Sequence, residues 1–511
     1  MVHPSNFVRP IVIGAGLSGL TAACLLAERG LSPLVLEANP DFAGGRLAGG
    51  KRVLIDDHPF QLEHGVHGFW QPYVNLTALL NRYQMNPGLV AAQEETWVHR
   101  QHGHIKRAAV GSAIRGSWLP APLHYLALFV RPRFLNIIGL RGFASLLSVW
   151  YSLILSVGID PLREQQPMAG LSLLDFTKGW STTVRDFGIG LARNSLSANP
   201  AEIPMAGFVA FLRYYTLLRR DSWGFSYLPG DAGACLIEPL QQKLIDMGGG
   251  VQLATAVTHI TPTDNNGWRI YSNQPALTTN HLILATDPDN AHKILQQSSL
   301  VSENDDFYWP RGRETAVIRL WFNRAPKPSS SSEAGIFTGD FTVDNFFWLH
   351  RLQKQYREWH EATGGSALEV HIYDAEEVGQ QADAALLAKV VAEVSAVFPE
   401  LRSHLIHQHL QRNSVNHTLF GIGPMGKHIS VKTPWPNLTC CGDWVYDPAP
   451  SFFMERATLT GIKAANRILQ ETGRTPFALE PYPDPEPLAA FVERLMHKGR
   501  QRLLARRKRT I

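Results

Sequence analysis

The sequence contains little cysteine. The four cysteines among its 511 residues are Cys24, Cys235, Cys440 and Cys441. Only the last two are neighbours, so they make neither a disulfide framework nor a metal-ligand spacing. We therefore expect a reducing compartment and no bound metal.

Charged residues are scarce as well. Asp, Glu, Lys and Arg make up 18% of the chain, less than in a typical soluble domain, whereas the hydrophobic share of 45% is ordinary. This low charge suggests an apolar ligand or a membrane surface. We expect no secretory signal peptide, because only nine residues precede Pro10 and glycines interrupt the apolar stretch that follows.

The positive charge is concentrated at the C-terminus. The net charge is +4, yet the last eighteen residues contain eight basic residues and no acid. Without those eight, 40 basic residues stand against 44 acidic ones, so the rest of the chain carries −4. Blocks of like charge are typical of solvated, disordered ends, and the next alternative is attraction to anionic lipid headgroups. We do not expect nucleic acid binding, since no recognition motif accompanies the basic block.

The N-terminal region has the pattern of a compact βαβ unit. A short apolar strand over 8–13 leads into a glycine run, a helical pattern follows from Leu17 through Arg29, and a second strand over 33–36 ends at Glu37. This order predicts a Rossmann-like parallel sheet that binds a dinucleotide.

The glycine run Gly14-Ala-Gly16-Leu-Ser-Gly19 suits a pyrophosphate. Gly14 permits the tight turn, Gly16 lets the backbone approach the phosphates, and Gly19 allows close packing of helix on sheet. The helix N-terminus adds amide donors and the positive end of its dipole. Glu37 can accept hydrogen bonds from ribose hydroxyls. The alternative is a chance glycine pattern, and the loop alone leaves NAD and FAD open.

Two further segments narrow the choice of cofactor. Gly44-Gly45-Arg46 follows soon after the second strand, and Gly442-Asp443 precedes a predicted helix over about 453–469. Together with the glycine loop, these segments resemble the amine oxidase and phytoene desaturase superfamily of flavoproteins. The resemblance implies non-covalently bound FAD in a Rossmann-like α/β domain of the glutathione reductase type, with an inserted α+β substrate domain rich in apolar helices.

The same resemblance implies roles for individual residues. Gly44, Gly45 and Arg46 would lie beside the flavin and its phosphates, and Gly442 and Asp443 would meet the pyrophosphate and the ribityl chain.

Two more positions complete the predicted cofactor site. The helix start near Met454 would aim its amides at the edge of the flavin ring. A backbone amide near Val257 would hold the adenine portion.

Other segments point to one branch of the superfamily. The run from Glu63 to Phe69, continued by Tyr73-Val-Asn75-Leu76, is similar to plant-type carotene desaturases. The stretch from Cys441 to Arg467 looks like that of the carotene desaturase/methyltransferases, the isorenieratene synthase type, which convert a β-ring into an aromatic ring. This likeness implies an apolar isoprenoid or carotenoid substrate. A flavin amine oxidase, another isoprenoid oxidoreductase or isomerase, and a prenyl-binding protein without flavin are the alternatives.

Such chemistry needs a group that takes a proton. Desaturation sends a hydride to the flavin and leaves a proton behind, and ring aromatisation also passes through cationic character. By type and position Glu63, His64, His67 and Glu455 are the candidates. Alternatively, Glu63 would hold a ribityl hydroxyl, His67 would be a hydrogen-bonded core residue, and Glu455 would pair with Arg456 or cap its helix.

The most apolar region runs from residue 120 to residue 159. Its part from 142 to 159 carries no charge over eighteen residues, the lower edge of a membrane-spanning length. The serines in it, and Arg131, Arg133 and Arg141 just upstream, favour a buried or interfacial helix. We expect this region to insert into the membrane surface and to form the substrate entrance. The protein would then be peripheral on the cytoplasmic side of a membrane. The alternative is that these helices are only the core of the substrate domain.

The domain organisation follows from these assignments. The FAD-binding domain is expected to be discontinuous, because its motifs lie at both ends of the chain. The predicted parts are 1–70, 225–300 and 435–470 for FAD binding, 71–224 and 301–434 for substrate binding, and 471–511 for a proline-rich linker with a basic tail. The sequence leaves the oligomeric state open.

Overall fold

The glycine loop belongs to a five-stranded parallel sheet. The computed structural model describes residues 9–164, 168–302, 305–310, 312–327, 332–373, 379–415, 417–422 and 426–507. The strand order is β10-β2-β1-β14-β22, with β1 Ile11–Ile13, β2 Leu34–Leu36, β10 Gly250–Gln252, β14 Leu282–Leu284 and β22 Leu438–Cys440. All four pairings are parallel. This sheet confirms the predicted Rossmann-like α/β core, whereas the residue boundaries of the domains stay a prediction.

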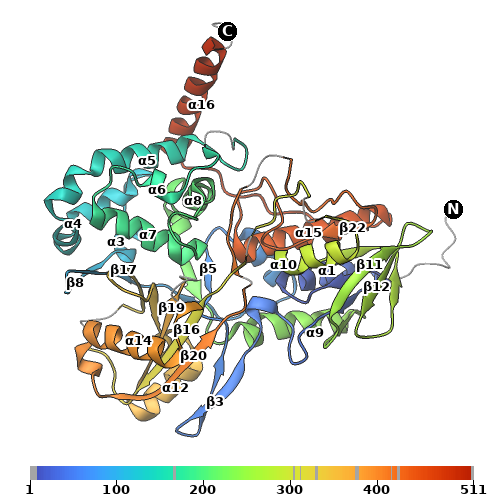
Figure 1. Ribbon diagram of the computed structural model, residues 1–511, viewed down its shortest axis with the longest axis horizontal. Helices are drawn as coiled ribbons and strands as arrows, with labels where there is room; N and C mark the ends of the chain where they lie inside the picture. The colour runs from blue at the N-terminus through green and yellow to red at the C-terminus, as the bar shows by residue number, and fades with distance from the viewer. Residues whose placement is uncertain are drawn as a thin grey trace.

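Two helices from opposite ends of the sequence pack together beside this sheet (Figure 1). They are α1 (Leu17–Glu28) and α15 (Phe453–Glu471). A Cβ on Gly461 would lie 2.6 Å from the carbonyl oxygen of Ser18, so glycine is what lets the helix backbones approach. The N-terminal and C-terminal motifs are therefore brought to the same sheet.

The apolar stretch over 250–260 is divided between two sheets. After β10 the chain turns at Ala254, where φ is +52°. Beyond the turn, β11 (Val257–Pro262) leaves the parallel sheet and pairs with β12 (Trp268–Ser272), which pairs with β13 (Leu277–Thr279). A left-handed backbone at a non-glycine residue is not visible in an apolar pattern.

A second, seven-stranded sheet lies in the lower left of Figure 1. Its order is β20-β16-β19-β18-β17-β7-β8, comprising β7 Glu95–Gln101, β8 His104–Ala109, β16 Ala316–Phe322, β17 Ala334–Gly339, β18 Asn345–Trp348, β19 Ser366–Ile372 and β20 Leu405–Arg412. Helix α14 (Asp383–Val397) buries its apolar side against this sheet. Strands β16 and β19 are buried at every position, which fits their central places.

Smaller strands connect the two sheets. They are β3 Lys51–Ile55 paired with β4 His58–Leu62, β5 Gly68–Trp70 and β6 Val90–Ala91 paired with β9 Phe225–Tyr227, and β15 Gly312–Arg313 paired with β21 His417–Thr418. The loop between β4 and β5 carries His64 and His67, both partly buried. Helix α2 (Val74–Arg82) follows β5.

Apolar helices form the upper left of the molecule in Figure 1. The uncharged run that suggested one helix is divided between α4 (Pro132–Ala144) and α5 (Leu146–Gly158), which meet at 90°. No single helix in the described ranges is long and apolar enough to span a membrane, although this bent pair meets the length and composition criteria together. Helix α8 (Met205–Leu212) is buried along its whole length.

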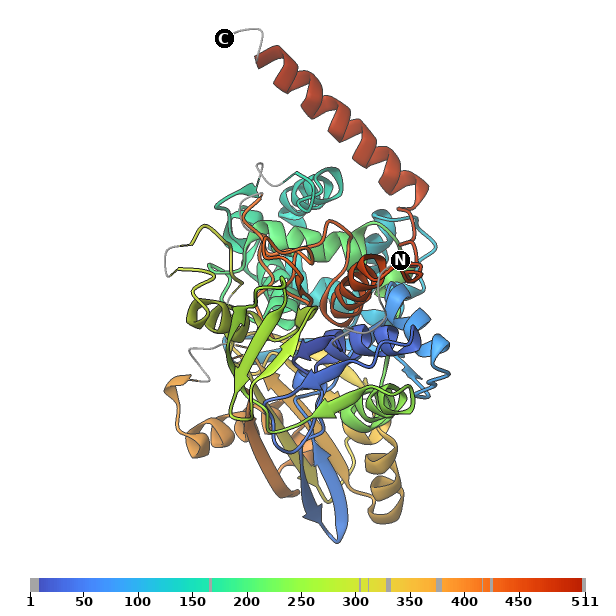
Figure 2. The same ribbon diagram turned by 90° about the vertical axis from the view of Figure 1, so that its right-hand side faces the viewer.

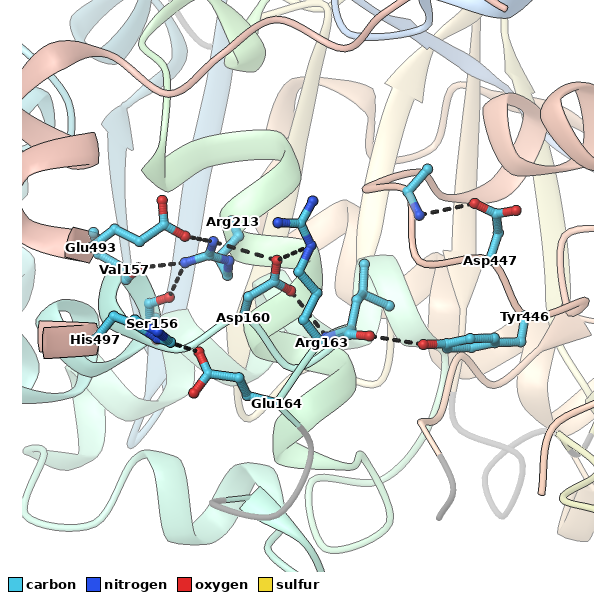
Figure 3. A network of polar contacts seen from close by, with 12 residues as sticks. Ser156, Val157, Asp160, Arg163, Glu164, Arg213, Tyr446, Asp447, Glu493 and His497 are labelled. Carbon is cyan, nitrogen blue, oxygen red and sulfur yellow. Dashed lines mark hydrogen bonds and ion pairs between the residues drawn. The ribbon is translucent and has the colours of Figure 1, made fainter. Parts of the chain in front are cut away.

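The C-terminal segment differs from the disordered end that its charge indicated. Helix α16 (Pro487–Arg507) is continuous and projects from the body (Figure 2). Its base is fixed by ion pairs. Arg213 contacts Glu493 at 2.5 Å, as Figure 3 shows. Arg500 donates to both carboxylate oxygens of Glu164 at 2.9 and 3.0 Å. Lys508 and Arg509 lie outside the described residues.

Candidate active site

The glycine loop has the geometry that a phosphate site needs. Gly14 has φ +103°, and a Cβ there would lie 2.7 Å from the carbonyl oxygen of Ala285, so only glycine fits. A Cβ on Gly19 would lie 2.1 Å from the carbonyl oxygen of Gly14. Gly16 differs, since a Cβ there would meet no described atom within 4 Å. The space beside Gly16 is thus open, at the N-terminus of α1, where no described side chain caps the amides.

Glu37 ties the second strand to this loop. Its carboxylate accepts hydrogen bonds from the backbone N–H groups of Ala15 at 2.8 Å and Asn39 at 2.9 Å. A partly buried carboxylate remains at the end of β2, as predicted from the βαβ pattern, and it braces the loop itself. Its predicted contact with a ribose stays a prediction.

The segment containing Arg46 lies beside the glycine loop. The N–H of Gly44 donates to the carbonyl oxygen of Ala15 at 2.9 Å. Positive φ angles at Gly44 and Gly45, +120° and +58°, turn the chain so that Arg46 points toward the C-terminal motif. The guanidinium of Arg46 contacts Oδ2 of Asp443 at 2.5 Å. Residues 397 positions apart therefore meet at one point.

The C-terminal motif is held from behind by α15. The N–H of Gly442 donates to Oγ1 of Thr460, and that hydroxyl also lies 3.0 Å from the carbonyl oxygen of Gly442. Met454 lies in the first turn of α15 and is buried. Val257 starts β11 and packs against the apolar cluster on one side of the parallel sheet. The cofactor roles of Met454 and Val257 stay predictions.

A cluster of histidines adjoins the Arg46–Asp443 pair. Burial lowers the pKa of His67 to about 4 and that of His417 to about 3, and Arg46 acts in the same direction on both. Burial also lowers the pKa of His64 well below its ordinary value. These imidazoles are neutral at pH 7, and within the described ranges Nε2 of His64 and Nε2 of His417 have no hydrogen-bond partner. A ligand can therefore contact these imidazoles without a charged side chain being buried beside it.

Glu369 organises the other side of the cluster. One oxygen accepts from the N–H of Val66 and contacts Nε2 of His371, both at 2.7 Å, and the other accepts from Nε of Arg319 at 2.7 Å. Burial opposes ionisation of Glu369, but Arg319 and His371 outweigh it and lower its pKa to about 2. This row of hydrogen bonds ends at Tyr373, whose hydroxyl lies 2.7 Å from Nδ1 of His371.

Sequence reasoning missed His371, His417, Glu369 and Tyr373. A signal was present, because Glu369, His371 and Tyr373 alternate with apolar residues and so lie on one face of a strand. A central apolar strand with three polar residues in period two marks a lined cavity or a buried network. The pattern cannot show that Arg319 and the β4–β5 loop are the partners.

Glu63 has partners that differ from those of the predicted roles. It accepts from the N–H of Ala232 at 2.8 Å and from Nε2 of Gln353 at 2.9 Å. Burial, with the charge of Glu369, raises its pKa to about 8. Glu63 therefore joins three parts of the chain in a buried position, and its part in proton transfer stays a prediction.

Glu455 caps a helix other than its own. It accepts from the N–H of Asn75 and the N–H of Leu76, both at 3.0 Å, in the first turn of α2. It also accepts from Nδ2 of Asn75 at 2.9 Å and from the hydroxyl of Tyr482 at 2.8 Å. Burial raises the pKa of Glu455, and its four hydrogen-bond donors act in the opposite direction by stabilising the anion. With all four donors supplied by α2 and Tyr482, the arrangement favours a structural role. Its part as an acid or base stays a prediction.

Comparison with known proteins identifies the fold and its relatives. Residues 17–469 match the family model for flavin containing amine oxidoreductase. The carotenoid phi-ring synthase of Streptomyces griseus is 27% identical over 90% of this chain and 88% of its own length. The 15-cis-phytoene desaturase of Capsicum annuum is 23% identical over 92% of this chain and 79% of its own length.

Solved structures agree on the fold. Cyclohexylamine oxidase from Brevibacterium oxydans IH-35A superposes with a TM-score of 0.68 and 18% identity, covering 92% of this chain and all of that one. Putrescine oxidase bound to putrescine gives a TM-score of 0.63 at 16% identity, covering 91% of this chain. These findings confirm the predicted resemblance to the amine oxidase and phytoene desaturase superfamily.

Proposed function

Because the chain belongs to the flavin-containing amine oxidoreductase family, we propose that it is an FAD-dependent oxidoreductase that desaturates and remodels the end ring of a carotenoid. The convergence of the glycine loop, Arg46 and Asp443 carries the cofactor assignment. The carotenoid assignment is supported by relatives named carotenoid phi-ring synthase and phytoene desaturase.

The residues of the site fit FAD. The uncapped N-terminus of α1 and the open space at Gly16 suit a pyrophosphate, and Arg46 offers a partly exposed positive charge. When bound, FAD supplies a two-electron acceptor for a substrate hydride. The chain's own residues position it and exclude water, while the neutral imidazoles of His67 and His417 line the adjacent space without adding charge.

Substitution of Gly16 tests the cofactor assignment. Gly16→Trp fills space that no described residue occupies, so the fold should persist while FAD is excluded. We expect the variant to purify without flavin absorbance and to keep its far-UV circular dichroism. Gly499→Trp is the matched control, because a Cβ there also meets no described atom within 4 Å. Stoichiometric FAD in Gly16→Trp would contradict the assignment.

Pigment analysis tests the substrate. In a host that accumulates β-carotene, expression of the chain should yield carotenoids with altered, more unsaturated end rings. An unchanged pigment profile from a flavin-loaded protein would refute the ring chemistry. Peroxide release with amines would instead favour an amine oxidase, the class of the structural neighbours.

We also propose that the protein docks peripherally on the cytoplasmic side of a membrane through its apolar helices. The α4–α5 apolar patch is defined here as Leu140, Phe143, Leu147, Tyr151 and Ile154, and all five side chains are exposed. Leu140 and Leu147 are 91% and 84% exposed. Apolar surface in contact with water is unfavourable, so burial of these side chains in lipid would release free energy. A hydrocarbon-soluble substrate would enter beside such a patch.

Charge near the patch supports anionic lipid as its partner. Arg131, Arg133 and Arg141 are exposed on or beside α4. Helix α16 packs against α5 and exposes Arg494, Lys498 and Arg502. Each basic side chain near an anionic surface adds about 1 kcal/mol of attraction. Helices α4 and α5 lie in the upper left of Figure 1, and α16 rises beside them at the top.

Vesicle binding tests this surface. Leu140→Ser with Leu147→Ser should reduce binding to vesicles containing anionic phospholipid at low salt. Leu54→Ser is the control, because Leu54 is also well exposed, at 72%, but lies on β3 at the opposite end of the molecule. Equal binding by the patch variant and the control would rule out docking through α4 and α5.

A further inference from the structure

A chain of hydrogen bonds runs from a buried ion pair to a tyrosine that none of the sequence motifs includes. Arg319 and Glu369 are each 1% exposed and are joined at 2.7 Å. Glu369 contacts Nε2 of His371, whose Nδ1 contacts the hydroxyl of Tyr373. The order is therefore guanidinium, carboxylate, imidazole and phenol, all on adjacent strands β16 and β19 or at the end of β19.

The ion pair determines which ring nitrogen carries the proton. Arg319 holds Glu369 as an anion, so the carboxylate can only accept a hydrogen bond. Nε2 of His371 must then carry hydrogen to donate to Glu369, and in the tautomer with its hydrogen on Nε2 the other ring nitrogen, Nδ1, is the acceptor. Tyr373 accordingly donates its hydroxyl hydrogen to Nδ1, which leaves lone pairs on its oxygen.

Tyr373 stands beside the cofactor motifs. Its ring centroid is 6.1 Å from that of His417, and His417 lies 6.4 Å from Phe453, the first residue of α15. Arg46 and Asp443 are the charged neighbours of His417. Tyr373 itself is partly exposed, whereas Glu369 and His371 behind it are buried. The phenol is thus the end of the network that a substrate can reach.

We infer that Tyr373 is the catalytic group that accepts the substrate proton, and that His371 and Glu369 position it and receive its own proton. This inference rests on the proposed carotenoid oxidation. Each two-electron oxidation removes a hydride and a proton from neighbouring carbons. The substrate C–H bond breaks, its proton bonds to Oη of Tyr373, and the phenolic proton passes to Nδ1 of His371. The resulting imidazolium is stabilised by Glu369 and later releases its proton to solvent.

A neutral phenol is a sufficient base for this step. Once the hydride has left, the neighbouring C–H bond is strongly acidic because its electrons stabilise the positive carbon. The base needs correct placement and a path for its proton, as in a serine–histidine–carboxylate arrangement. Asn345 supports the placement, since its Nδ2 lies 3.4 Å from the hydroxyl of Tyr373.

The test compares Tyr373→Phe and His371→Gln with the wild type, using β-carotene as substrate. We expect the kcat for ring conversion to fall about 100-fold in Tyr373→Phe, while KM and the flavin-to-protein ratio change less than about twofold. The isotope effect from deuterium on the substrate ring should increase, because proton removal becomes slower. Tyr227→Phe is the control, since Tyr227 is buried, its ring contacts Phe225 and Phe347, and its hydroxyl has no described hydrogen-bond partner.

A second readout does not depend on activity. In protein labelled with ¹⁵N-histidine, the Nδ1 resonance of His371, assigned by its loss in His371→Gln, should shift in Tyr373→Phe and stay unchanged in Tyr227→Phe. Unaltered kcat in Tyr373→Phe, loss of flavin in parallel with activity, or an unshifted Nδ1 resonance would each overturn the inference. Absence of product from flavin-loaded wild type would instead refute the proposed function.

Discussion

The prediction that most sharply separates structure from chemistry concerns Glu455. Its carboxylate replaces the missing N-cap of α2, a helix whose own N-cap residue, Tyr73, provides no side-chain hydrogen bond. In Glu455→Gln, one side-chain oxygen can still accept from Asn75 and Tyr482. The new amide group then faces the N–H of Leu76, which is left without an acceptor.

The cost can be worked from these contacts. A buried N–H left unsatisfied costs about 1–3 kcal/mol, and loss of the negative charge at a helix N-terminus costs roughly 0.3–1 kcal/mol more. The expected destabilisation is therefore about 1.3–4 kcal/mol. With an unfolding entropy of about 2.1 cal/mol/K per residue over 511 residues, Tm should fall by roughly 1–4 °C if unfolding is cooperative.

Differential scanning calorimetry and a pigment assay together check this prediction. Glu455→Gln should show the lower Tm yet keep its ring conversion per bound flavin. Glu471→Gln is the control: it lies on the same helix, pairs with Arg467 at the surface, and should cost about 0–1 kcal/mol. An unchanged Tm with abolished turnover in Glu455→Gln would show that the carboxylate is an acid or base after all.

Three further predictions follow from the site and its histidines. Arg46→Gln should weaken FAD binding at least tenfold in a fluorescence titration, because Asp443 then stands unpaired beside the phosphates; unchanged affinity would remove Arg46 from the cofactor site. Burial lowers the folded-state pKa of His67 to about 4 and of His417 to about 3, so the unfolded chain binds protons first as pH falls below about 6.5. Urea unfolding of flavin-free protein should thus give a free energy lower at pH 5 than at pH 7 by about 1–2 kcal/mol per histidine, and this difference should shrink in His67→Gln; an equal pH dependence in that variant would contradict burial of a neutral imidazole. Replacing Arg494, Lys498 and Arg502 with glutamine should leave flavin content unchanged and should weaken vesicle binding at low salt but not at high salt. Weaker binding at high salt as well would indicate a damaged fold.

The parts of the fold that the sequence predicts are those determined locally. The strand, glycine loop and helix over 11–28 follow from adjacent residues, and the structure agrees within a few positions. The meeting of Arg46 with Asp443 was inferred only from family resemblance, since nothing within either segment specifies the other. Resemblance supplied the long-range information that periodicity lacks.

The missed features depend on contacts distant in sequence. The hydrogen-bond donors of Glu369 include Arg319, 50 residues away, and the backbone N–H of Val66, 303 residues away. The uncharged run over 142–159 was correctly identified as apolar, but the 90° bend near Ser145 was not visible in it. Glu455 was selected by type, whereas the donors that occupy it come from α2 and Tyr482. Sequence spacing can identify a candidate residue, but its hydrogen-bond partners in the folded protein determine its role.

The pairing of Arg46 with Asp443 has a consequence for how the protein matures. A ribosome makes the glycine loop first, but β22 and Asp443 emerge roughly 400 residues later, and β22 is the strand that completes one edge of the parallel sheet. At about 5–20 residues per second, that interval lasts on the order of 20–80 seconds. During this time the nascent chain holds half a cofactor site, so flavin capture must await release of the last strand. Cellular flavin supply therefore acts on the finished chain, and a nascent chain halted before β22 should remain colourless.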